Sequence, residues 1–173
     1  MGKIFYAEKS IYSSENAIKR ILLEFYEIKN ATILRTKNGK PYVESTPFFS
    51  VSNTEKMLFI AFSSANVGLD AELLSRKPNY DSIVKKFHKD EREEITCAEE
   101  FLKHWVVKES AVKYLGGTLA HDLSKLVFVN DRLLYNGAEL PVKLNFFNLE
   151  EHLICVCGEE DFSKAEFIRL TSL

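Results

Sequence analysis

The sequence predicts an α+β fold built from two pseudo-symmetric halves, each a helix packed on a small antiparallel sheet. In both parts of the chain a short apolar strand is followed by helical spacing and then by a meander of short strands with hairpin turns. Each part closes on a comparable apolar strand, at 57–62 and 153–158. The length of 173 residues, 46% of them apolar, supplies material for one core or for two small halves that share it.

The predicted N-terminal half covers residues 1–66. Lys3–Ala7 is expected as a strand, and Ser13 or Ser14 can cap a helix. That helix is indicated by apolar residues at helical spacing, namely Ile18, Ile21, Leu22, Phe25 and Ile28. The meander that follows contains an Asn38-Gly39 turn, and its strands are expected at 32–35, 42–43, 48–52 and 57–62.

The predicted C-terminal half covers residues 67–173. A strand is expected at Val67–Leu73, and a helix-rich stretch follows Pro78 and ends near Leu115. The strands of the second meander are expected at 125–129, 132–135, 142–149 and 152–158. No repeat in the sequence itself relates the two halves, so their symmetry is inferred from the order of elements alone.

The net charge of −2 gives no global attraction to nucleic acid or to a membrane, and neither is expected as a partner. No stretch reaches transmembrane length, and Met1–Lys9 has no apolar secretory segment, which favours a cytoplasmic protein. Cys155 and Cys157 alternate within an apolar run and therefore share one face of a strand. Buried thiols are expected there, with a metal or redox pair as the alternative.

Two carboxylates stand side by side on the strand at 67–73. Its apolar residues occupy alternate positions, which leaves Gly68, Asp70 and Glu72 together on the other face. Cα atoms at i and i+2 in a strand are about 6.5 to 7 Å apart. One oxygen-seeking cation can bridge that span, and Mg²⁺ or Mn²⁺ suits such ligands. Gly68 is expected to leave open space beside them; an exposed edge with solvated carboxylates is the alternative.

A charge pair continues an apolar stripe on the long helix before Leu115. Leu102, Val106, Glu109 and Lys113 are spaced by four, three and four residues and share one face. Charged groups that extend a core-facing stripe are expected at the rim of the core, where each needs a partner, an ion or a ligand. A plain surface pair of Glu109 and Lys113 is the alternative.

The two clusters together resemble the signatures of the 4'-phosphopantetheinyl transferase superfamily. The strand carries G-x-D-x-E at 68–72, and the helix carries W-x-x-K-E-[SA]-x-x-K at 105–113. Further likeness lies in Gly39-Lys40-Pro41, in Phe49–Asn53 and in Gly116–Leu119. The chain is most similar to the two-half, surfactin-synthetase-activating type with a shortened N-terminal half, and the resemblance implies that family's fold.

The resemblance implies transfer of the phosphopantetheine arm of coenzyme A to a serine of an apo acyl or peptidyl carrier protein, as in enzymes of the holo-[acyl-carrier-protein] synthase type. It implies Mg²⁺, with Mn²⁺ as the alternative ion, held by Asp70, Glu72 and Glu109. Glu109 and Lys113 would be the catalytic residues. The contacts to coenzyme A that it implies are Lys40, Ser52, Asn53, Lys108 and Lys113.

A local basic excess marks the segment 76–89, which holds five cations against Asp81 alone. Carrier proteins of this class are typically acidic, so the segment resembles a docking face for the carrier. The solvated side of a helix is the alternative. The cations are Arg76, Lys77, Lys85, Lys86 and Lys89.

Two departures from the family pattern leave a second function open. Asn53 stands where the family usually has a histidine that touches a phosphate of coenzyme A, and the N-terminal half is shorter than usual. The alternative is a catalytically degenerate member that only binds coenzyme A or a carrier protein. The acidic run Asp90–Glu94 superficially resembles a Nudix motif and is interpreted instead as a solvated helix start.

Overall fold

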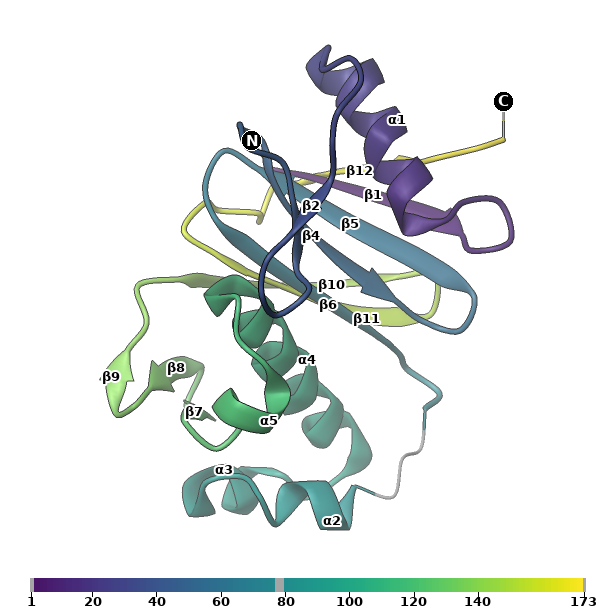
Figure 1. Cartoon of the computed structure of the whole chain (residues 1–173). Coiled ribbons are helices and arrows are strands. Elements are labelled where there is room, and N and C mark those ends of the chain that lie inside the picture. The colour runs from purple at the N-terminus through teal and green to yellow at the C-terminus, as the bar shows by residue number, and fades with distance from the viewer. Residues whose placement is uncertain (1, 77–79, 173) are drawn as a thin grey trace.

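Two sheets lie face to face in the computed structural model, with a helix on the outer side of each (Figure 1). The structure describes residues 2–76 and 80–172. The first sheet has the order β12-β1-β5-β4. Its strands are β1 (Lys3–Glu8), β4 (Phe48–Asn53), β5 (Met57–Ser63) and β12 (Glu166–Arg169).

Helix α1 (Ser14–Tyr26) covers the first sheet, as predicted. The helix begins where the Ser13 side chain accepts a hydrogen bond from the backbone N of Asn16, and it ends before Glu27, which adopts a left-handed conformation at φ 57°. Its apolar face packs on inward residues of β1, β4 and β5 to form one core. The buried helix residues are Ala17, Ile18, Ile21 and Leu22.

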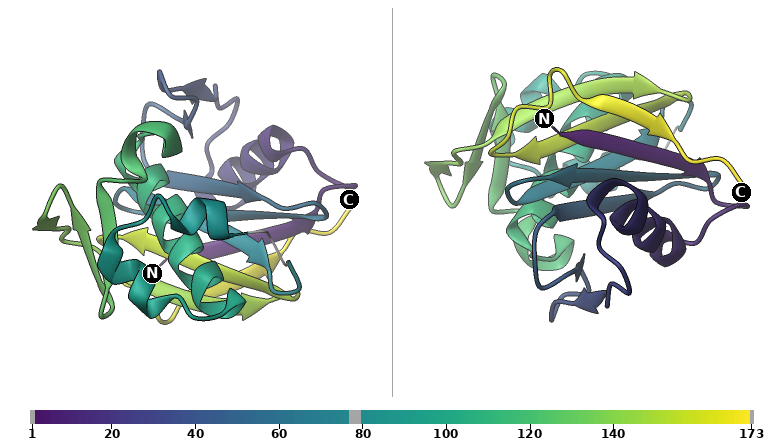
Figure 2. Two further views of the ribbon diagram at one scale, coloured as in Figure 1. Left: turned by 90° about the horizontal axis from the view of Figure 1, so that it is seen from below. Right: turned by 90° about the horizontal axis from the view of Figure 1, so that it is seen from above.

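The second sheet and its helix repeat this arrangement, so the predicted pseudo-symmetry is confirmed (Figure 2). The sheet has the order β10-β11-β6, and its strands are β6 (Val67–Leu73), β10 (Lys143–Leu149) and β11 (His152–Gly158). Its outer face is covered by α4 (Ala98–Leu115). In both halves the first strand pairs with the last, and the last pairs with the one before it.

The core between the sheets decides which way β6 faces. Val67, Leu69 and Ala71 are buried there with Phe59 and Ile154. The alternation along β6 therefore turns Gly68, Asp70 and Glu72 toward α4. Cys155 and Cys157 of β11 are free thiols buried under α4, as predicted.

Shorter elements lie in the loops that connect the main helices and strands of each half. In the first half they are β2 (Leu34–Arg35) and β3 (Pro41–Tyr42). In the second half the helices are α2 (Asp81–Val84), α3 (Lys89–Glu94) and α5 (Leu119–Asp122). A small sheet there consists of β7 (Leu126–Val129), β8 (Arg132–Tyr135) and β9 (Ala138–Glu139).

The C-terminal strand β12 was not predicted. It pairs in parallel with β1, with Lys3 opposite Glu166 and Tyr6 opposite Arg169. The last strand of the chain therefore belongs to the sheet of the first half, and the division of the chain at residue 67 stays a prediction. Within the described ranges, no helix is long and apolar enough to span a bilayer.

Candidate active site

Side chains close the outer edge of β6, where no strand of the described residues pairs with it. The Oγ atoms of Ser50 and Ser52 on β4 accept hydrogen bonds from the backbone N of Leu69, at 2.9 Å, and of Ala71, at 3.1 Å. Lys40 donates to the carbonyl oxygen of Val67 at 3.0 Å, and Lys113 donates to that of Leu69, also at 3.0 Å. Buried backbone groups need such partners, so Lys40, Ser50 and Ser52 join the first half to β6 along a seam between β4 and β6, and Lys113 adds a contact from α4.

Asp70 lies in the middle of this seam and is buried. Its Oδ1 accepts hydrogen bonds from Ser52 Oγ at 2.9 Å and from Lys113 Nζ at 2.6 Å. Its Oδ2 is buried and has no hydrogen-bond partner among the described residues. Burial raises the pKa of Asp70, and Lys113 and Ser52 oppose that shift. One carboxylate oxygen is thus fixed by two hydrogen bonds, and the other has none among the described residues.

Glu72 stands two residues further along the same face of β6. Its Oε1 accepts a hydrogen bond from Trp105 Nε1 of α4 at 3.2 Å and forms an ion pair with Arg76. Trp105 was predicted only as part of the helix motif. The indole N–H is the part of that motif that reaches the strand.

Glu109 and Lys113 lie one turn apart on the face of α4 that meets β6. Burial is the main cause that raises the pKa of Glu109 to about 7, and repulsion from Asp70 adds to it. Lys113 lowers it in part by attraction. The Glu109 carboxylate makes no hydrogen bond or ion pair with the described residues. The predicted stripe is confirmed, because Leu102 and Val106 are buried and the charges continue it.

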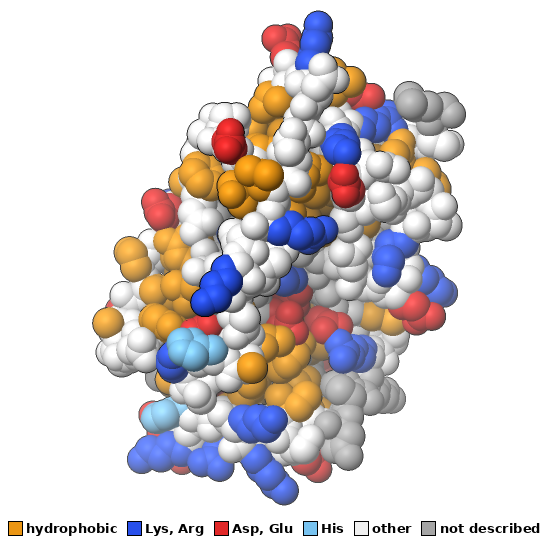
Figure 3. All heavy atoms as spheres, viewed as in Figure 1, with side chains coloured by type: hydrophobic (Ala, Val, Ile, Leu, Met, Phe, Trp, Pro, Cys, Tyr) orange, Lys and Arg blue, Asp and Glu red, His pale blue; other side chains and the backbone are white. Residues whose placement is uncertain are grey.

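The carboxylates of β6 and α4 therefore face one another across the open side of the seam. Figure 3 shows acidic side chains gathered in the middle of this face, between the sheets and the lower helices. No group of three or more His, Cys, Asp or Glu side chains is arranged to hold a metal ion in residues 2–76 and 80–172. Asp70, Glu72 and Glu109 are neighbours without forming a closed cage.

Gly68 corrects one expectation. The open space expected beside the carboxylates is filled by the backbone of α4, since a Cβ at Gly68 would lie 1.9 Å from the carbonyl oxygen of Ser110 and 2.5 Å from the N of Tyr114. A side chain at this position would push the helix off the strand. The glycine allows α4 to bring Glu109 and Lys113 close to β6.

Lys40 and Asn53 lie at opposite ends of the seam. Lys40 contacts the start of β6 and borders a cavity of about 310 Å³ with Tyr42, Phe48 and Tyr114. Burial lowers the pKa of Lys40 to about 8. Asn53 is exposed at the end of β4 and exchanges hydrogen bonds with Ser14 of α1. Contacts from either residue to coenzyme A stay predictions.

Ser52 and Lys108 are turned away from solvent. Ser52 is buried, and both of its hydrogen bonds stay within the protein, to Asp70 and Ala71. Lys108 and Glu91 are 0% exposed and form an ion pair at 3.0 Å. This placement gives no support to a phosphate contact from Lys108. The interpretation of 90–94 as a solvated helix start is wrong for Glu91.

The basic segment is described in part. Lys85, Lys86 and Lys89 are exposed around α2 and α3, and Arg76 is paired with Glu72. Lys77 lies outside the described residues. Docking of a carrier on this segment stays a prediction.

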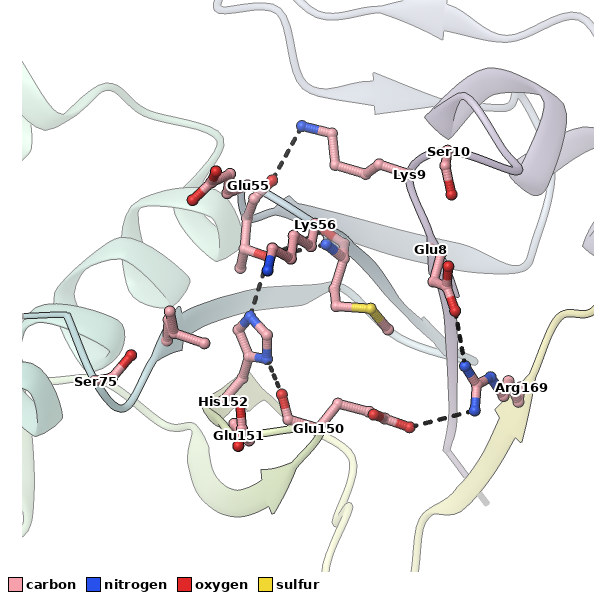
Figure 4. Close-up of a pocket in the computed structure, with 13 residues that line it drawn as sticks. Glu8, Lys9, Ser10, Glu55, Lys56, Ser75, Glu150, Glu151, His152 and Arg169 are labelled. Atoms are coloured by element: carbon pink, nitrogen blue, oxygen red, sulfur yellow. Dashed lines mark hydrogen bonds and ion pairs between the residues drawn. The ribbon is translucent and has the colours of Figure 1, made fainter.

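A cavity of about 720 Å³ opens at the end of the sheets beyond Glu72. It is bordered by the turns after β1, β4, β6 and β10 (Figure 4). His152 joins two of these turns, since its Nδ1 donates to the Glu150 carbonyl and its Nε2 forms a hydrogen bond with Thr54 Oγ1, 3.0 Å away. Arg169 pairs with Glu8 and Glu150 across the cavity. Asp70, Glu109 and Lys113 do not border it.

Comparisons with known proteins identify the family of the chain. The family model of the 4'-phosphopantetheinyl transferase superfamily matches residues 66–162, which include β6, α4 and β11. The 4'-phosphopantetheinyl transferase gsp of Aneurinibacillus migulanus is 29% identical over 110 residues, which are 59% of this chain and 46% of that protein. The chain thus spans about half the length of the curated relative that it matches.

Proposed function

Because the chain belongs to the 4'-phosphopantetheinyl transferase superfamily, we propose that it transfers phosphopantetheine from coenzyme A to a serine of an apo acyl or peptidyl carrier protein, as a holo-[acyl-carrier-protein] synthase type enzyme. The observation that carries the proposal is the seam between β4 and β6. There one fixed, buried carboxylate, a second carboxylate with a raised pKa and a lysine meet on one open face.

The donor types suit a hard divalent cation, Mg²⁺ or Mn²⁺, although in the described residues the three carboxylates are not gathered around one point. Asp70 Oδ2 is buried without a partner among the described residues, and burial, with repulsion from Asp70, raises the pKa of Glu109. Asp70, Glu72 and Glu109 would hold the ion, and Glu72 would exchange its ion pair with Arg76 for it. When bound there, Mg²⁺ supplies positive charge to the pyrophosphate of coenzyme A.

The residues of the chain have separate roles in the proposed reaction. The carrier serine oxygen attacks the β-phosphate of coenzyme A, and the bond to adenosine 3',5'-bisphosphate breaks. Glu109 accepts the serine proton. Lys113 neutralises the leaving phosphate, and Ser52 keeps Asp70 in place during the reaction. Lys40 and Asn53 are proposed contacts to coenzyme A at the two ends of the seam.

The test is mass spectrometry of apo carrier proteins after incubation with the chain, coenzyme A and Mg²⁺. We expect a pantetheine mass increment on the carrier serine and none after treatment with a chelator. Asp70→Asn should abolish Mg²⁺ binding measured by calorimetry and lower transfer by at least about 10²-fold, because it removes a fixed negative ligand. Coenzyme A binding without transfer to any carrier would instead identify a catalytically degenerate member. Unchanged Mg²⁺ binding by Asp70→Asn would show that the ion site lies elsewhere.

A further inference from the structure

Two glutamates of the short helix α3 contact both α4 and the chain at the end of β7. Glu91 Oε1 accepts a hydrogen bond from the backbone N of Phe128 at 3.0 Å, and its Oε2 forms the ion pair with Lys108. Glu94 makes a similar backbone contact one turn later, but its neighbour on α4 is a histidine whose Nε2 makes no hydrogen bond in the described residues. Glu94 Oε1 accepts from the backbone N of Asn130 at 3.0 Å, and its Oε2 lies 3.3 Å from His104 Nε2 of α4.

The two contacts differ in burial. The side chains of Glu91 and Lys108 are 0% exposed, whereas that of Glu94 is 33% exposed. Lys108 also donates to the carbonyl oxygens of Leu123, at 3.1 Å, and Leu126, and its Nζ lies 4.5 Å from the centre of the Phe87 ring. A fully buried ion pair adds little net stability over apolar side chains of the same volume. In this pair four contacts fix the position of Lys108 Nζ. This geometry indicates a role in positioning α4.

Lys108 immediately precedes Glu109 on α4. Successive helical residues point about 100° apart, so a lysine anchored to α3 and β7 fixes the rotation of α4 about its axis. Contact of the α4 backbone with Gly68 fixes the separation of α4 from β6. Rotation and separation together decide how Glu109 meets Asp70.

We propose that Glu91 is a positioning residue that acts through Lys108 to hold Glu109 against Asp70. Its relevance to catalysis rests on the proposed function, whereas its effect on the orientation of α4 does not. Trp105 reports that orientation, because it is the single tryptophan of the chain and its indole donates to Glu72 on β6.

The test compares Glu91→Gln with the matched control Glu94→Gln, which alters the same helix without touching Lys108. Mn²⁺ affinity is measured by calorimetry, Trp105 exposure by acrylamide quenching of the folded protein, and transfer by kcat and KM. For Glu91→Gln we expect Mn²⁺ affinity to fall about tenfold or more, as when other residues that orient metal ligands are removed. Trp105 should become more accessible, and kcat should fall with little change in KM for coenzyme A. Glu94→Gln should stay within about twofold on each measurement.

A second variant separates positioning from simple stability. Glu91→Gln/Lys108→Met removes both charges, so it should recover thermal stability, but methionine cannot donate to the Leu123 and Leu126 carbonyls and Mn²⁺ affinity should stay low. Recovery of Mn²⁺ affinity together with stability would overturn the proposal, as would normal affinity and normal Trp105 quenching in Glu91→Gln. If Glu91→Gln does not fold, the double variant decides. If the wild type binds no Mn²⁺, the proposed function fails at its metal site, and Trp105 quenching still tests the orientation of α4.

Discussion

The surroundings of Glu109 disfavour the charged form of its carboxyl group. Burial, then repulsion from Asp70 and Glu72, raises the pKa of Glu109 from 4.5 to about 7, and Lys113 and Arg76 offset only part of this. Between these two pH values the folded chain holds a proton that the unfolded chain has released. The contribution of Glu109 to the free energy of unfolding therefore falls as the pH rises from 4.5 to 7, and it stays low above that.

Glu109→Gln should accordingly be more stable than the wild type above pH 7 when no divalent cation is present. The expected gain is about 3 kcal/mol, since the pKa rises from 4.5 to about 7 and one pKa unit corresponds to about 1.4 kcal/mol, and it should vanish below pH 4.5. Chemical denaturation at several pH values measures it. Added Mg²⁺ should stabilise the wild type and not the variant. A constant difference across the pH range would mean that Glu109 titrates normally in the folded chain.

At the scale of elements, the edge of β6 explains why two serines alternate on β4. An unpaired strand edge exposes N–H and C=O groups that must find partners. Ser50 and Ser52 supply them from the neighbouring sheet, and both serines are buried. Only Ser52 also reaches Asp70, so the seam combines support of the backbone with orientation of a carboxylate.

Ser50→Ala and Ser52→Ala are therefore a matched pair. Each leaves one buried backbone N–H of β6 without its partner, which should cost about 1 to 3 kcal/mol of unfolding free energy. Ser52→Ala alone should also weaken Mg²⁺ binding about tenfold, because Asp70 loses the hydrogen bond that orients it. Denaturation and calorimetry give the two quantities. Equal loss of Mg²⁺ affinity in both variants would show that the seam acts as a whole and that the contact to Asp70 has no separate role.

The elements that could be predicted are those whose signal is local. β6 has strict alternation and was predicted with the bounds that it has, and the cap of α1 was predicted at its start. Ile28 was expected on α1 but lies beyond the end of the helix at Tyr26. Strand β12 could not be predicted, because its partner β1 lies at the other end of the chain. From the sequence around it, Glu91 would be expected on the surface. It is buried because Lys108 of α4 and the backbone of β7 pack against it in the folded chain.

The candidate site lies between the two halves of the molecule. β6 and α4 supply the carboxylates and Lys113, while β4 and the turn before β3 supply Ser50, Ser52 and Lys40. Strand β12 pairs with β1 and so joins the end of the chain to the first half. Each half contributes groups that the other lacks, so we expect neither half to bind a divalent cation alone.

The predicted docking of the carrier depends on the exposed lysines around α2 and α3. Lys85, Lys86 and Lys89 are exposed on the side of α4 that carries α2 and α3, in a chain whose net charge is −2. An acidic carrier would be attracted to this local excess. Such attraction weakens as the Debye length falls from about 10 Å at 0.1 M salt to about 3 Å at 1 M. The KM for the carrier should therefore rise steeply with salt, while the KM for coenzyme A reports separately on the seam.

Lys85→Glu/Lys86→Glu should raise the KM for the carrier about tenfold at 0.1 M salt and flatten its salt dependence, with kcat nearly unchanged, because rim charges act mainly on encounter. The matched control is Lys29→Glu/Lys164→Glu, which changes the net charge by the same amount at exposed lysines far along the chain from α2 and α3. Steady-state kinetics with one purified carrier protein over a salt series measures both variants. If the control raises the KM for the carrier as much as the α2 variant does, net charge governs the encounter and the basic segment is no docking face.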